Sequence, residues 1–153
     1  MLQTPTQSLG LDPTDSQELI AKLKGKVLLG DRAETLITEA GIKRTTTERV
    51  RIATSTLRSL GVTNPTRFEK AVSEERLGIK FCSIEIACQY RLQYDDQPTS
   101  EVLFMPVMVR EKIVMFCISR YYCGEKLLYA YPAESFLENI GPSYQIVYRA
   151  HDL

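Results

Sequence analysis

The sequence contains few of the residues that catalyse reactions by acid–base or nucleophilic chemistry. The single histidine, His151, lies close to the end of the sequence, where a Ser-His-Asp or Cys-His arrangement is hard to assemble. No Gly-x-Ser-x-Gly or Gly-x-Gly-x-x-Gly motif occurs, and the Gly25-Lys26 pair is preceded by Ile20 where a phosphate-binding loop begins with glycine. We therefore expect no catalytic residues and no enzyme.

The acidic residues do not form an obvious catalytic pair. Asp95 and Asp96 are adjacent in a turn-forming segment, where exposed carboxylates more often serve solubility than acid–base catalysis. Glu85 and Arg91 fall on the same side of a predicted strand, and an ion pair on a solvated face explains both.

Four cysteines could bind metal or form disulfides, but their spacing favours neither. Cys82 and Cys88 are separated by five residues, as are Cys117 and Cys123, whereas a zinc knuckle separates its cysteines by two. In one strand, Cys82 and Cys88 would lie about 20 Å apart. We expect reduced, mostly buried thiols, and neither a metal nor another cofactor.

A local excess of basic residues suggests one binding surface. Residues 42–67 carry six cations and a single acid, Glu48. On a helix over residues 48–60, basic residues seven positions apart would line one stripe, and Leu60-Gly61-Val62 has the outline of a helix-turn-helix connection. Arginine and lysine side chains of this kind contact phosphate groups. The nucleic-acid-binding residues of this hypothesis are Arg44, Arg51, Arg58, Arg67 and Lys70.

The overall charge favours a different interpretation of that stripe. Lys plus Arg and Asp plus Glu are equal at 19 each, so no net field attracts nucleic acid. The second helix of the motif would also carry Glu69, Glu74 and Glu75, which phosphate repels. We therefore favour a solvated or protein-contacting face and keep nucleic-acid binding as the alternative.

The second half of the chain has the composition of a sheet. All eight tyrosines lie at or after position 90, and apolar strand patterns cover residues 101–110, 113–121, 126–131 and 143–149. These strands are too apolar to be half solvated, which favours a protein partner or a second copy of the chain. Coverage of both faces by helices and loops explains the pattern equally well. The predicted interface residues are Met115, Tyr129, Tyr131, Tyr144 and Tyr148.

The predicted fold is α+β, with a helical layer followed by a sheet layer. We expect a flexible tail over residues 1–13 and then a single domain over residues 14–153. Its helical layer, residues 14–77, would contain about four short helices, and its sheet layer, residues 79–149, would be an antiparallel meander with one late short helix from Pro132. The alternating pattern of residues 79–94 predicts the central strand.

Together these features predict a non-catalytic protein-interaction module, an adaptor, a regulator or a structural subunit, that forms a homodimer through its apolar sheet. The first residues lack a basic region followed by an apolar run, and no stretch reaches the roughly 20 apolar residues that span a membrane. We therefore expect no membrane association and an intracellular, cytoplasmic location.

Overall fold

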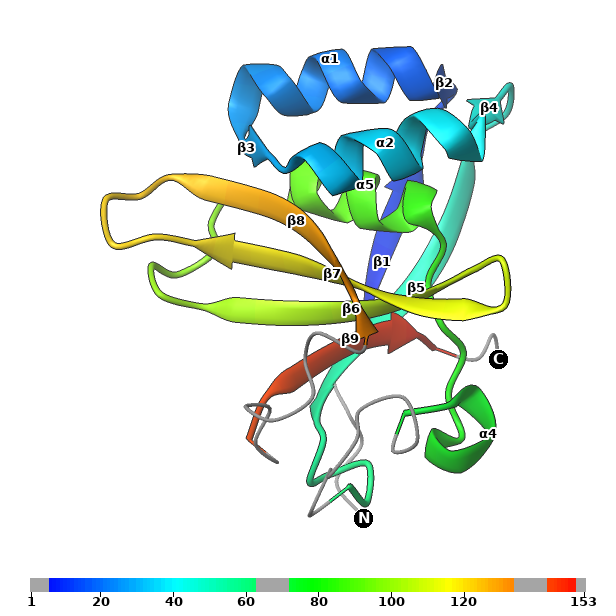
Figure 1. Cartoon of the computed structure of the whole chain (residues 1–153), viewed down its shortest axis with the longest axis vertical. Coiled ribbons are helices and arrows are strands. Elements are labelled where there is room, and N and C mark those ends of the chain that lie inside the picture. Colours follow the sequence, from blue (N-terminus) through cyan, green and yellow to red (C-terminus); the bar gives the residue numbers. More distant parts are fainter. Residues whose placement is uncertain (1–5, 63–71, 134–142, 151–153) are drawn as a thin grey trace.

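One mixed sheet of seven strands organises the fold, in the order β1-β5-β9-β6-β7-β8-β3. The structure, a computed structural model, describes residues 6–62, 72–133 and 143–150 (Figure 1). Neighbouring strands are antiparallel except for two parallel pairs, β6 with β9 and β3 with β8. The strand bounds are Thr6–Leu11 for β1, Leu28–Leu29 for β3, Glu48–Thr56 for β5, Val102–Val109 for β6, Lys112–Arg120 for β7, Lys126–Pro132 for β8 and Gln145–Arg149 for β9.

Three helices cover one face of this sheet: α1 (Ser16–Lys26), α2 (Asp31–Ala40) and α5 (Ile84–Gln93), as Figure 1 shows. A two-stranded sheet of β2 (Thr14–Asp15) and β4 (Lys43–Arg44) joins the ends of this helical layer. The short helix α4 (Glu74–Leu77) lies beyond the opposite face.

A side-chain cap marks the start of α1, and a left-handed glycine marks the end of α2. The Asp15 side chain accepts the backbone N–H of Glu18 at 2.8 Å and so caps α1. Gly41 adopts a φ of 57°, a left-handed conformation that ends α2 at low steric cost. Two of the roughly four short helices expected within residues 14–77 are therefore present, as α1 and α2.

The central strand predicted over residues 79–94 is wrong, because most of this segment forms α5. Ser83 caps the helix by accepting the N–H of Ile86. Six consecutive residues, 86–91, are buried, so the helix contacts protein on every side. A helix buried all round has no polar stripe, and its apolar residues then need not follow the helical period. The strand-like alternation arose by coincidence within this buried segment.

The helix expected over residues 48–60 is also wrong, since Glu48–Thr56 form β5. Val50 and Ile52 pack toward the helical layer, while Ala53 belongs to the core on the other face. Because β5 is buried on one face at Val50 and Ile52 and on the other at Ala53 and Ser55, its buried residues fall at spacings that mimic a helical face. The fourth expected helix, the second helix of the supposed helix-turn-helix motif, falls mostly on residues 63–71, which lie outside the described residues. In the described residues directly after this gap, the helix present is α4.

The described part of the chain begins with a strand, so the flexible tail is wrong from residue 6 onward and the separate helical layer is wrong as well. Thr6–Leu11 pair with β5 in an antiparallel register from Thr6 opposite Ala53 to Leu11 opposite Glu48. The meander is confirmed for β6, β7 and β8, but β9 inserts between β5 and β6, parallel to β6. The late helix was expected mainly over residues 134–142, which lie outside the described residues.

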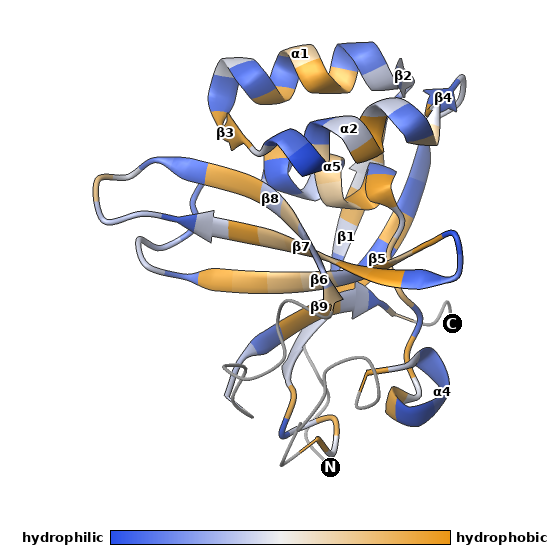
Figure 2. Ribbon diagram, viewed as in Figure 1, coloured by the Kyte–Doolittle hydropathy of each residue, from blue (hydrophilic) through white to orange (hydrophobic). Residues whose placement is uncertain are grey.

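Apolar side chains form a core on each side of the sheet. Leu23, Ile37 and Phe116 are fully buried between the helical layer and the sheet. Met115 and Ile146 are buried on the opposite face, and Figure 2 shows the apolar colouring of the central strands. None of the helices in the described ranges is long and apolar enough to span a membrane.

Candidate functional site

The sheet surface opposite the helical layer carries a group of aromatic and sulfur-containing side chains on β6, β7 and β8. Alternate residues of a strand point to the same face, and the strand register then places side chains in rows across the sheet. One row runs from Phe104 through Cys117 to Tyr129, and the next joins Met115 to Tyr131. Tyr144, which directly precedes β9, adds its ring next to Phe104. We call this surface the tyrosine face; its residues are Phe104, Met115, Cys117, Tyr129, Tyr131 and Tyr144.

The rings of the tyrosine face contact one another. The Phe104 and Tyr144 ring centroids lie 5.4 Å apart with the planes tilted by 54°. Tyr129 and Tyr131 meet edge to face, with 6.3 Å between centroids. Both separations are in the range where aromatic pairs stabilise each other beyond simple burial. Contacts within the chain therefore hold these rings in place.

The members of the tyrosine face differ in exposure: some side chains contact solvent and others are buried beneath them. Tyr131 is 37% exposed and Tyr144 is 36% exposed, whereas Tyr129 and Cys117 are half-buried. Met115 is fully buried beneath them. The available surface is thus made by tyrosine rings, which combine apolar area with a hydroxyl group that can donate or accept a hydrogen bond.

Burial holds three titratable groups of this surface, on Tyr129, Tyr131 and Cys117, in their neutral forms. Burial raises the pKa of the Tyr129 hydroxyl, and the neighbouring Tyr121 hydroxyl raises it further. Burial likewise raises the pKa of Tyr131, with Cys117 as the next cause. The Cys117 pKa is itself raised by burial, so this residue is a thiol and not a reactive thiolate.

A close backbone approach positions Tyr129. An ideal Cβ built on Gly30 would lie 2.6 Å from Cδ1 of the Tyr129 ring, nearer than real contacts allow. Glycine at position 30 therefore lets the ring pack directly on the backbone that connects β3 to α2. The Gly30 backbone therefore covers one side of the Tyr129 ring.

The predicted interface residues are partly brought together. Tyr129, Tyr131 and Tyr144 contribute exposed or half-buried surface, and Met115 lies directly under it. Tyr148 is 8% exposed, and its hydroxyl group lies 2.9 Å from the Ser55 hydroxyl, so it belongs to the core. Sequence reasoning missed Phe104 and Cys117, although alternation along β6 and β7 could have assigned both to this face.

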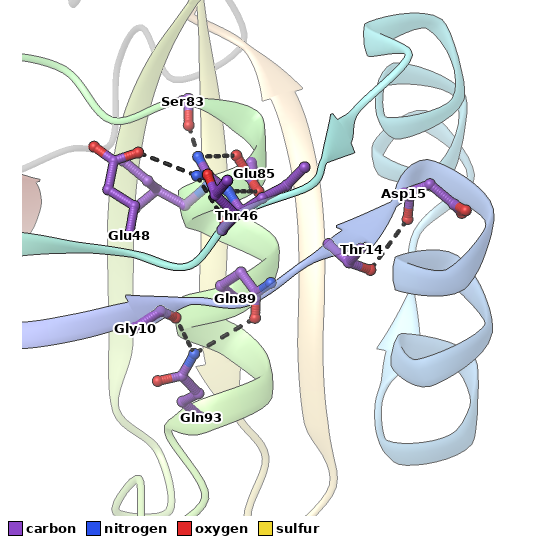
Figure 3. A network of polar contacts seen from close by, with 11 residues as sticks. Gly10, Thr14, Asp15, Thr46, Glu48, Ser83, Glu85, Gln89 and Gln93 are labelled. Carbon is purple, nitrogen blue, oxygen red and sulfur yellow. Dashed lines mark hydrogen bonds and ion pairs between the residues drawn. The ribbon is translucent and has the colours of Figure 1, made fainter.

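The three described basic residues of the nucleic-acid hypothesis, Arg44, Arg51 and Arg58, do not form a helical stripe. Arg44 lies in β4, where its guanidinium group makes two hydrogen bonds to Glu85, at 2.7 and 3.0 Å, and an ion pair with Glu48 at 3.1 Å (Figure 3). The hydrogen bonding that Arg44 donates to Glu85 is the main cause that raises the Arg44 pKa. The charge of Arg44 is thus neutralised within the protein.

The remaining basic residues lie on different elements. Arg51 is on β5 and donates to the Thr6 hydroxyl at 2.9 Å, and Arg58 follows β5 in a turn. Arg67 and Lys70 lie outside the described residues. Since β5 replaces the first helix of the supposed motif, the helix-turn-helix interpretation of residues 44–75 is wrong.

A buried arginine ties α5 to the ends of β7 and β8. The Arg91 side chain is fully buried and donates to the Gln97 side chain at 2.6 Å and to the carbonyl oxygens of Tyr94, at 2.8 Å, and Ser119, at 3.1 Å. A longer bond of 3.4 Å reaches the Leu127 carbonyl. Burial lowers the pKa of this guanidinium. Each contact serves the fold, so we assign Arg91 a structural role.

The described residues hold no group of three His, Cys, Asp or Glu side chains that could bind a metal ion. The four cysteines are free, and burial raises the pKa of Cys82 and Cys88 to about 12. Two buried thiols that stay protonated are poor nucleophiles and poor metal ligands. The tyrosine face is therefore the best candidate site in the described part of the chain.

The chain matches no protein-family model, no curated protein sequence and no solved structure.

Proposed function

We propose that this protein is a non-catalytic interaction module that forms a homodimer through the tyrosine face. The observation that carries the proposal is the exposure of packed tyrosine rings beside fully buried Met115. Tyrosine is enriched where proteins bind one another, because its ring buries a large area and has only two side-chain torsions to fix. A role as an adaptor, a regulator or a structural subunit follows from such a surface.

A second copy of the chain is the occupant that the chemistry favours. No residue of the tyrosine face is charged, so two copies can meet there without like-charge repulsion. The chain as a whole has a formal net charge of zero, so no net repulsion opposes association. A two-fold dimer uses one patch twice, which requires a surface that is compatible with itself. Neutral hydroxyl groups that both donate and accept meet that requirement.

The proposal includes an intracellular, cytoplasmic location. Cys123 is an exposed free thiol, and the other three cysteines are also unpaired. Reducing compartments maintain thiols in this state, whereas oxidising ones favour disulfides.

Light scattering during size-exclusion chromatography tests the proposal. The wild-type protein at about 50 µM should give twice the chain mass of 17.4 kDa. Tyr131→Glu should raise the dimer dissociation constant at least about tenfold, because association would bury an unpaired carboxylate. Tyr122→Glu is the matched control, since Tyr122 is 90% exposed in the turn after β7 and should tolerate the charge.

Circular dichroism melts would first establish that both variants fold. A folded Tyr131→Glu variant that dimerises like the wild type, or a wild-type protein that stays monomeric at this concentration, would refute the proposal. A charged residue at Met115 is not a useful test, because Met115 is fully buried and the substitution would damage the core.

A further inference from the structure

A cavity of about 490 Å³ lies at the turn end of the hairpin between β6 and β7, beside the first turn of α2. Three of its lining residues are cations: Arg32 from the first turn of α2, Arg110 from the hairpin turn, and Lys112 from the start of β7. Its size is in the range of small-molecule sites in proteins. This cavity does not include the tyrosine rings, and it is lined by cations, whereas the tyrosine face is uncharged.

The positive charge of the cavity is largely uncompensated. No acidic residue lines it among the described residues. Arg110 has one ion pair there, with Glu39 at 3.9 Å, and side-chain exposures of 79% and 48% make this a weak contact. Arg32 and Lys112 have no acidic partner within 4.0 Å in the described ranges. Three neighbouring cations that share one weak acidic contact attract an anion.

The hairpin turn provides an independent observation. Arg110 and Glu111 form a two-residue turn with φ angles of 49° and 68°, the left-handed region that favours glycine or asparagine. Neither residue is of the favoured type, so the turn is retained at an energetic cost. Backbone strain of this kind is concentrated at ligand-binding sites, and here it holds a cavity-lining arginine.

The rest of the cavity lining is apolar and includes Val109, Val114 and Pro132. Guanidinium groups bind phosphate and carboxylate oxygens through paired hydrogen bonds, and an apolar wall favours a hydrocarbon or aromatic group. We propose that this cavity binds a small organic anion, with its phosphate or carboxylate group among Arg32, Arg110 and Lys112 and its apolar body against the valines and the proline.

Calorimetric titration with phenyl phosphate, benzoate and inorganic phosphate tests this assignment. Phenyl phosphate or benzoate should bind at millimolar or tighter dissociation constants, and whichever binds tighter identifies the charged group. Inorganic phosphate should bind at least about fivefold more weakly than phenyl phosphate, because it lacks the apolar body. Equal affinity for the two phosphates, or no binding of either organic anion at about 10 mM, would overturn the proposal.

Charge-removing variants locate the site. Arg32→Gln and Lys112→Gln should each weaken binding at least about fivefold, since each removes a charged hydrogen-bond donor. Lys26→Gln is the control, because Lys26 is an exposed cation at the end of α1, away from the cavity lining, and should change affinity less than about twofold. Equal losses in all three variants would overturn the assignment, as would no loss in the two cavity variants. The cavity variants should still dimerise, so failure here is distinguishable from failure of the proposed interface.

Discussion

Replacement of Arg91 should show whether its buried charge stabilises the fold. Arg91→Met keeps most of the side-chain volume but removes the donor of the Gln97 side-chain oxygen and of the Tyr94, Ser119 and Leu127 carbonyl oxygens. A buried acceptor without its donor costs about 1–3 kcal/mol, so the three acceptors with bonds of 3.1 Å or less together cost about 6 kcal/mol, and the longer bond to Leu127 adds little. Removal of a desolvated cation returns about 3 kcal/mol. We therefore expect a net loss of about 3 kcal/mol in the free energy of unfolding.

Urea unfolding followed by circular dichroism measures this loss. With a slope of about 2 kcal/mol per molar urea, the midpoint should fall by about 1.5 M. Arg91→Lys keeps the charge, but its single ammonium group cannot span acceptors on separate segments, so it should lose about 2 kcal/mol. Arg58→Met is the control, because Arg58 is exposed in a turn and should change stability by less than about 0.5 kcal/mol. An Arg91→Met variant as stable as the wild type would refute the reasoning, since desolvation would then outweigh the hydrogen bonds.

Two further predictions concern other polar groups. Burial raises the pKa of the Cys82 and Cys88 thiols to about 12, whereas an unfolded thiol titrates near 8.5. The stability that the neutral thiols contribute is therefore complete below about pH 8.5 and is lost as pH rises toward 12. The free energy of unfolding should fall by up to about 1.4 kcal/mol per pH unit for each thiol. Urea titrations at about pH 8 and 10 should show this decline, and an equally steep decline in Cys88→Ala would contradict it. Glu85→Gln should lower the free energy of unfolding by about 1–3 kcal/mol, because the Arg44–Glu85 pair is only 17% and 13% exposed. Glu18→Gln, which breaks an exposed pair, should cost less than about 0.5 kcal/mol, and equal losses in the two variants would contradict the role of burial.

Local sequence signals were sufficient where an element has one buried face or a strong boundary. The α2 helix has buried Ala33 and Ile37 on one side, an exposed opposite side, and Gly41 at its end. The strands β6, β7 and β8 follow one another with short turns, so their antiparallel pairing follows from sequence order. Tyr129 and Tyr131 of β8 could be assigned to one face because side chains two residues apart in a strand point to the same side.

The same signals failed where an element is covered on all sides. The α5 helix is buried around its circumference over residues 86–91, and the second half of β5 is buried on both faces, so neither has a continuous polar side to reveal its period. The position of β9 between β5 and β6 depends on contacts between residues far apart in the chain. Local propensity cannot encode such long-range pairing, which burial and packing decide.

The sequence by itself determined the scarcity of catalytic groups, the balanced charge, the first two helices and the concentration of tyrosines in the second half of the chain. The tertiary structure decided which residues meet. It paired Arg44 with Glu85, buried Met115 under Tyr131, and gathered Arg32, Arg110 and Lys112 around one cavity. Residue types set the chemistry that is available, because each side chain carries its own donors, charges and apolar area. Only the long-range register of the sheet and its helical cover sets which of these groups are adjacent and which stay in contact with solvent.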